Sequence, residues 1–294
     1  MPGTIWEEAG VADTGGVSDE DRRAAWRLGQ RLDEQLRRAA YQGRPALGPR
    51  GGVWIGQKPD TAARKGSAAS SVPASPARSR PAGVAGMLVH DSFQPWKSRL
   101  DRLVLAGAHG FEELRFDARC PTGVRGTPPH LDVLAVRPGG LVAVSAKGGS
   151  YLVHREKGLV EAYTTLPAMP GLEPWQELAA ELARRPDLFH FVDVANLVKL
   201  ALGLGATFRG FAMKLLYLYF EPPFASINPC FALHRTELAR VVAGVEGSAV
   251  TLVTQTYAEL WDEWEASSEA GWLRNMVAGL RQRYDVTLPP EKGL

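Results

Sequence analysis

The chain has 294 residues, 45% of them apolar and 22% charged, a composition that excludes a wholly disordered or fibrous protein. The formal net charge of +2 excludes a protein that binds polyanions by bulk charge alone. There is no apolar run near the roughly 18 residues of a membrane span, no secretory signal pattern, and only two cysteines. We therefore expect a cytoplasmic protein without a membrane partner or a disulfide scaffold.

Residues 1–44 are predicted to form an N-terminal helical segment. Ser18 is a suitable N-cap, and the three acidic residues that follow it suit the positive first turn of a helix. Apolar residues then recur at steps of three and four, from Ala25 to Ala39, and Gly43 ends the pattern. This apolar stripe needs a partner, which is either the main domain or a second copy of the chain in a homodimer.

Residues 45–86 differ sharply in composition from the rest. Of these 42 residues, 27 are Pro, Gly, Ser or Ala, and the stretch carries six basic residues against one acidic residue. Such a segment buries too little apolar surface to offset its ordering entropy. We predict a flexible basic linker, either a passive tether or an arm for nucleic acid.

Residues 87–294 have a net charge of −2 and alternate between helical and strand patterns. Helices are predicted at about 95–109, 156–166, 173–184, 191–203, 235–243, 256–266 and 269–283. Strands are predicted near 114–119, 131–136, 141–147, 211–219 and 249–254. This order predicts an α/β fold with a mixed central sheet and C-terminal helices.

The second and third predicted strands form a hairpin around Pro138-Gly139. A symmetric hairpin places Asp132 opposite Ser145 and His130 opposite Lys147. Because side chains alternate along a strand, these four polar residues share one face of the sheet. Buried charges must be paired or used. The quartet is therefore either a functional site or an Asp–Lys ion pair on an exposed sheet face.

This arrangement resembles the PD-(D/E)XK, or restriction-endonuclease-like, nuclease superfamily. Asp132 and Lys147 match the family motif, fifteen residues apart. The order helix, three strands, helices, strand is similar to the family core, and the upstream GFEELRFDARCP looks like its acidic element, at Glu113. The segments GTPPHLDVLAV, FVDVANLVKLALGL and LLYLYFEP are similar to a bacterial restriction-endonuclease-like group.

The resemblance implies a metal-dependent DNA endonuclease that hydrolyses phosphodiester bonds. Asp132, Glu113 and the backbone carbonyl of Ala146 would hold Mg²⁺ or Mn²⁺, since hard cations prefer oxygen ligands. Lys147 would orient the attacking water or offset developing negative charge. DNA is the partner that this activity implies.

Ser145 stands where the family has a glutamate, so the site lacks one acidic ligand. Three interpretations remain open. Glu156 or Glu161 reaches back from the next predicted helix, or His130 lends a nitrogen. Alternatively, the domain has lost catalysis and is a module that binds nucleic acid or a protein.

Four basic residues are candidates for phosphate contacts: Arg115, Arg119, Arg125 and Lys199. Ion pairs with Glu113 or Asp117 would equally explain the first two, and a solvated helix face would explain Lys199. Cys120 and Cys230 are predicted to be small buried hydrophobes. The predicted C-terminal tryptophans are assigned to the core.

Overall fold

The computed structural model describes residues 17–42, 83–153, 158–267 and 270–287. Residues 45–82 of the predicted linker and Glu156 lie outside the described residues. The helices are α2 (Asp19–Tyr41), α3 (Gly83–Phe93), α4 (Glu173–Arg184), α5 (Val194–Thr207), α6 (Pro229–Gly244), α7 (Tyr257–Ser267) and α8 (Gly271–Arg283). The strands are β1 (Glu113–Arg119), β2 (His130–Arg137), β3 (Gly140–Lys147), β4 (Ala212–Tyr219) and β5 (Val250–Thr256).

The five strands form one mixed sheet in the order β1-β2-β3-β4-β5. β1, β2 and β3 pair antiparallel in succession, whereas β3, β4 and β5 run parallel. β3 and β4 are buried along nearly their whole length, as strands covered on both faces must be. The predicted α/β class, with its mixed sheet, is confirmed.

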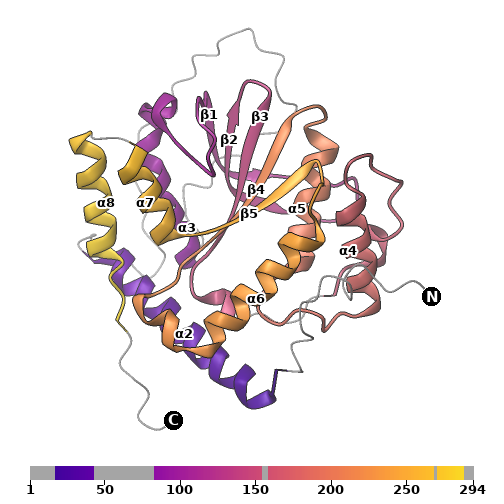
Figure 1. Cartoon of the computed structure of the whole chain (residues 1–294), viewed down its shortest axis with the longest axis horizontal. Coiled ribbons are helices and arrows are strands. Elements are labelled where there is room, and N and C mark those ends of the chain that lie inside the picture. Colours follow the sequence, from indigo (N-terminus) through magenta and orange to yellow (C-terminus); the bar gives the residue numbers. More distant parts are fainter. Residues whose placement is uncertain (1–16, 43–82, 154–157, 268–269, 288–294) are drawn as a thin grey trace.

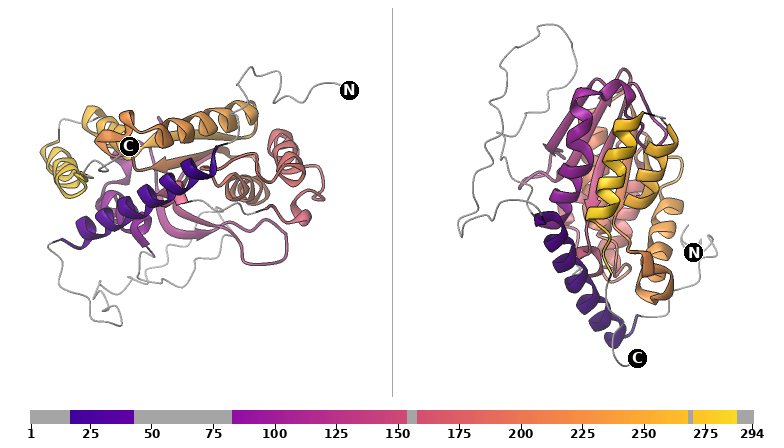
Figure 2. Two further views of the ribbon diagram at one scale, coloured as in Figure 1. Left: turned by 90° about the horizontal axis from the view of Figure 1, so that it is seen from below. Right: turned by 90° about the vertical axis from the view of Figure 1, so that its left-hand side faces the viewer.

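Helices cover both faces of the sheet (Figure 1). α3 and α7 pack against one face, and α5 and α6 pack against the other. α4 lies against α5, and α8 lies against α7, so these two helices widen the outer layers. Figure 2 shows the same layers from two further directions. In the described part of the chain, no helix combines the length and apolarity needed to cross a membrane.

The predicted helix at 95–109 is wrong. α3 ends at Phe93, and two short 3₁₀ turns, Gln94–Ser98 and Leu100–Arg102, follow it. Pro95 lacks the amide that a helix interior needs, and Gly107 adopts a positive φ of 69°. Of the C-terminal tryptophans predicted for the core, Trp261 and Trp264 are buried and Trp272 is partly buried against it. Trp96 packs edge-on against Trp264 and Trp272.

α3 begins at Gly83, four residues before the predicted end of the linker. Val84, Met87 and Leu88 are buried there, so burial decides the conformation where composition suggested a linker. The predicted helix at 156–166 is also wrong for its described part. The regular secondary structure of residues 158–166 is limited to one 3₁₀ turn, Glu161–Tyr163.

α2 has the predicted N-cap, because the Ser18 hydroxyl accepts a hydrogen bond from the Asp21 amide. Its apolar stripe packs against the main domain at the 3₁₀ turn Ser150–Val153, which follows β3. Gly29 permits this contact, since a β-carbon there would lie 2.5 Å from Val153. Of the two partners that the sequence left open, the described contacts show the main domain.

Candidate active site

Polar residues at the ends of the strands lie along one edge of the sheet. β1, β3, β4 and β5 all finish at this edge and β2 starts there, because β2 alone runs antiparallel to the others. The edge is lined, in strand order, by Asp117, Asp132, Lys147, Tyr219 and Thr256. The topology therefore brings together residues that span 140 positions of sequence.

The β2–β3 hairpin has the predicted register. Arg137 pairs with Gly140, and Gly139 takes a φ of 68°, which suits glycine after proline in a tight turn. The ladder ends at Val133 and Val144. Asp132 and Ser145, which the symmetric hairpin would pair next, lie beyond the end of this ladder, where β2 leaves β3.

The carboxylate of Asp132 fills the gap between the two strands. Its Oδ2 accepts a hydrogen bond of 2.7 Å from the backbone amide of Ala146. In an antiparallel pair, the N–H and the C=O of one residue point toward the same neighbouring strand. Because the Ala146 amide points toward β2, the Ala146 carbonyl faces β2 as well. Asp132 thus occupies a fixed position with its second oxygen free of this bond.

Burial raises the pKa of the Asp132 carboxyl, and it outweighs the amide of Ala146 and the charge of Lys147, which both lower that pKa. The charge of Asp117 raises the pKa further. A raised pKa means that the ionised carboxylate is costly in this place without a cation. The local electrostatics therefore favour a positive ion between the two acids.

Asp117 is the site residue that sequence reasoning missed. Its neighbours pair with Val133 and Leu131, so it lies opposite Asp132. Its φ is +52°, an uncommon conformation for a residue other than glycine. Its Oδ1 lies 2.7 Å from Nδ1 of His130, and both side chains are open to solvent.

Glu113, predicted to complete the acidic side, lies elsewhere. It pairs with Val136, four residues along β1 from Asp117, which is about 13 Å in a strand. Arg115 holds its carboxylate in a two-pronged ion pair. The structure therefore does not bring Glu113 to Asp132. Arg115, a candidate for phosphate contact, is paired with Glu113 instead.

The other predicted acids do not join the site. Glu161 is exposed on its 3₁₀ turn, and no contact links it to Asp132. Ser145 is 2% exposed and sits beside Tyr217 of β4 in the ladder. Within the described ranges, no three His, Cys, Asp or Glu side chains converge to hold a metal ion. At the β1–β2 end of this edge, the described residues bring together two carboxylates, those of Asp117 and Asp132.

The remaining basic candidates divide by position. Arg119 ends β1 opposite His130 and is exposed, so it stands beside the acidic pair. Arg125 is exposed in the loop between β1 and β2. Lys199 of α5 is half-buried, with its ammonium 5.6 Å from the centre of the Tyr163 ring. Only Arg119 and Arg125 are freely presented near the edge.

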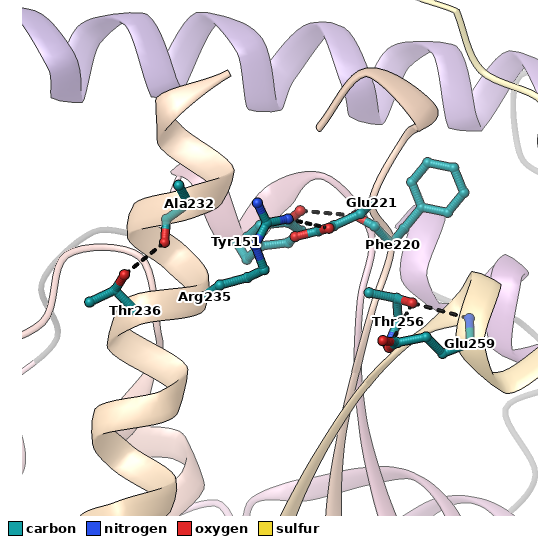
Figure 3. Close-up of polar contacts among 8 residues, drawn as sticks. All are labelled: Tyr151, Phe220, Glu221, Ala232, Arg235, Thr236, Thr256 and Glu259. Carbon is teal, nitrogen blue, oxygen red and sulfur yellow. Dashed lines mark hydrogen bonds and ion pairs between the residues drawn. The ribbon is translucent and has the colours of Figure 1, made fainter. Parts of the chain in front are cut away.

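A second polar cluster occupies the β4–β5 end of the same edge (Figure 3). The Tyr151 hydroxyl donates to the carbonyl of Phe220, and Arg235 pairs with Glu221 at 2.7 Å. Glu259 accepts bonds from the amide and hydroxyl of Thr256. Beneath them His234 is fully buried, and burial lowers its pKa to about 3. Sequence reasoning did not find this cluster.

No family model, curated protein or solved structure matches the chain. The fold defines the chain as an α/β protein with a five-stranded mixed sheet between helical layers. Its function must therefore be argued from the site itself.

Proposed function

We propose that the chain is a metal-dependent nuclease that hydrolyses phosphodiester bonds in DNA at the Asp117–Asp132–Lys147 edge. The observation that carries this proposal is the pair of carboxylates on adjacent strands, next to a lysine on the third. The order of elements from α3 onward, with a helix before three strands and further helices before β4, is similar to the core of restriction-endonuclease-like proteins. DNA is the substrate that this resemblance suggests.

The residues present fit Mg²⁺ or Mn²⁺. Proteins usually hold Mg²⁺ by one or two carboxylates, and waters and substrate phosphate complete its shell. Asp117 and Asp132 would provide the carboxylates, with the Ala146 carbonyl beside them, and the raised pKa of Asp132 supports a place for a cation. Bound there, the ion would polarise a phosphoryl oxygen and acidify a water.

The chain's own residues contribute in three ways. The Ala146 amide fixes Asp132, so its carboxylate needs no reorientation when substrate arrives. The Lys147 ammonium stands near that carboxylate and offsets negative charge that develops on the phosphate. His130 holds Asp117 from the solvent side.

The second candidate function is a non-catalytic module with a nuclease-like core. It is favoured by the buried Ser145 in place of the motif glutamate and by the absence of a third acid among the described residues. Such a module would bind nucleic acid or a protein partner without cutting.

Plasmid cleavage with Mg²⁺, Mn²⁺ or EDTA tests the two candidates. We expect cleavage that depends on metal and falls at least about 100-fold in Lys147→Ala, the size of effect typical for a lost electrostatic contact to the reacting group. Lys97→Ala, an exposed lysine on the other side of β1, is the matched control. Cleavage that survives in Lys147→Ala contradicts the proposal. Wild type that binds DNA without cutting it supports the module.

A further inference from the structure

The outward face of α2 is rich in arginine and carries two exposed aromatic side chains. Its inward face packs a stripe of Leu and Ala against the domain, so no apolar stripe remains outside. The outward face follows helical steps of three and four residues and includes Arg23, Arg27, Arg37, Arg38, Trp26 and Tyr41, together with the acidic Glu20 and Glu34. The two aromatic side chains are 42% and 41% exposed, although large apolar side chains are mostly buried in this protein.

The arginines of this face lack full compensation. Among the described residues, no ion pair or hydrogen bond holds Arg23 or Arg27. Arg38 pairs with Glu34, and both are well exposed, a geometry that contributes little to stability. Burial raises the pKa of the Asp33 carboxyl, and the nearby charge of Arg37 opposes that rise in part. The face thus presents guanidinium groups to the solvent.

α2 is anchored beside the candidate active site. The Gly149 amide donates a 2.6 Å hydrogen bond to Oδ1 of Asp33. Gly149 is two residues after Lys147, and Leu32 of α2 packs directly on it, because a β-carbon at Gly149 would lie 2.8 Å from Leu32. A strand of substrate that leaves the site along this edge therefore meets α2.

We propose that the outward face of α2 binds the sugar–phosphate backbone of nucleic acid, with Arg23, Arg27 and Arg37 on phosphates. This inference rests on the proposed function, since it names a surface for the same substrate. Arginine fits phosphate geometry, and exposed aromatics beside basic groups are typical of nucleic-acid surfaces. The sequence after α2 continues this charge, because residues 45–86 carry a net +5.

A membrane surface fits this face less well. A helix that lies on a membrane inserts an apolar stripe into the lipid. In α2 that stripe is already buried against the domain, where Leu32 and Leu36 are 0% exposed. The exposed arginines of α2 are therefore what this face offers a partner, and a polyanion with regularly spaced phosphates complements them.

Fluorescence anisotropy of labelled 20-mer DNA, measured in EDTA over a range of salt concentrations, tests the inference on the full chain. The variant is Arg23→Gln/Arg27→Gln/Arg37→Gln. The control with the same charge change is Arg102→Gln/Arg209→Gln/Arg274→Gln, three exposed arginines elsewhere. Each lost phosphate contact removes about 0.9 from the slope of log affinity against log salt. Between 50 and 200 mM salt, wild-type affinity should therefore fall about 40-fold more than that of the α2 variant.

The control should keep the wild-type slope. Equal losses in both triple variants, or no loss in either, would overturn the inference. Retention of wild type on phosphatidylserine vesicles, without any DNA binding, would also overturn it. EDTA separates binding from cleavage. Metal-dependent cleavage together with an unchanged α2 slope refutes this inference alone, whereas α2-dependent binding without cleavage refutes the nuclease proposal alone.

Discussion

Two groups of titratable side chains lie at one edge of the same sheet: an open group of Asp117, His130 and Asp132, and a buried group of His234, Tyr217 and Glu237 that excludes water. At the β1–β2 end, Asp117 and His130 have side chains that are 52% and 37% exposed, and Asp132 lies half-buried behind them. At the β4–β5 end, His234 and Tyr217 are fully buried, beneath Tyr151. Burial shifts pKa values in both groups.

The comparison teaches that a shifted pKa does not by itself mark a site. The buried group uses its polar atoms within the protein. Tyr217 and His234 share a hydrogen bond, and Glu237 nearby accepts three backbone amides. The open group keeps a carboxylate pair that nothing neutralises fully. We therefore assign structure to the first and function to the second, and the predictions below separate them.

The largest expected effect is at Glu237. Its carboxylate accepts the amides of His190, Phe191 and Val192 at 2.7–3.0 Å, and the side chain is 4% exposed. Glu237→Leu removes the acceptor of three backbone amides, two of them on buried residues, each at a cost of about 1–3 kcal/mol. We expect a loss on the order of 5 kcal/mol in urea unfolding. Glu173→Leu, exposed on α4, is the control. A loss below 1 kcal/mol would mean that the buried group is not structural.

His234 should make stability depend on pH. Its pKa is about 3 in the folded protein and 6.5 when free, so the unfolded chain binds the proton more tightly. Stability is therefore lost as pH falls below about 6.5, by roughly 2 kcal/mol between pH 7 and pH 5. Urea midpoints at several pH values should show this loss for wild type and a smaller one for His234→Phe. His109→Phe, an exposed histidine, should behave as wild type. Identical profiles for all three would refute the assignment.

Asp132 should make stability depend on pH in the opposite direction. Its pKa is raised in the folded state, so metal-free stability decreases as pH rises through that pKa. Asp132→Asn keeps an oxygen for the Ala146 amide and removes the charge. We expect a gain on the order of 1 kcal/mol at pH 8 in EDTA and little change at pH 4. The exposed Asp101→Asn supplies the comparison. A clear loss of stability at pH 8 would place Asp132 among the structural carboxylates.

The smallest effect concerns the backbone at Asp117. Its φ of +52° is strained for any residue with a β-carbon and free for glycine. We expect Asp117→Gly to be about 1 kcal/mol more stable than Asp117→Ala, as thermal unfolding in EDTA can measure. Both variants lose the carboxylate, so the pair isolates the conformation. An alanine variant as stable as the glycine variant would show that the strain is absent.

The sequence predicted the hairpin well because Pro138-Gly139 fixes its register, and the register then places Asp132, Ser145 and Lys147. The pairing of β1 could not be predicted in this way. A loop of ten residues separates Arg119 from His130, and no short turn sets which residue faces Asp132. The family resemblance pointed to Glu113, whereas the pairing of β1 places Asp117 opposite Asp132.

Long-range packing explains the other differences. The residues of the buried group at the β4–β5 end come from a 3₁₀ turn, a strand and a helix, between Tyr151 and Glu237. No local sequence pattern connects them. Likewise, α3 packs against the sheet and buries Val84, although its first four residues belong to the stretch whose composition predicted a linker. Hydrophobic periodicity predicts which face of an element is apolar, but it does not predict which element packs against that face.

The most direct test is calorimetric titration of Mn²⁺ into wild type, Asp117→Asn and Glu113→Gln. Asparagine tolerates a positive φ, so Asp117→Asn removes the charge and keeps the fold. The structure predicts that Asp117→Asn weakens Mn²⁺ binding at least about tenfold, while Glu113→Gln, held by Arg115 away from the site, binds as wild type does. Weak binding in Glu113→Gln with normal binding in Asp117→Asn would contradict the assignment of Asp117 and Asp132 as the acidic pair.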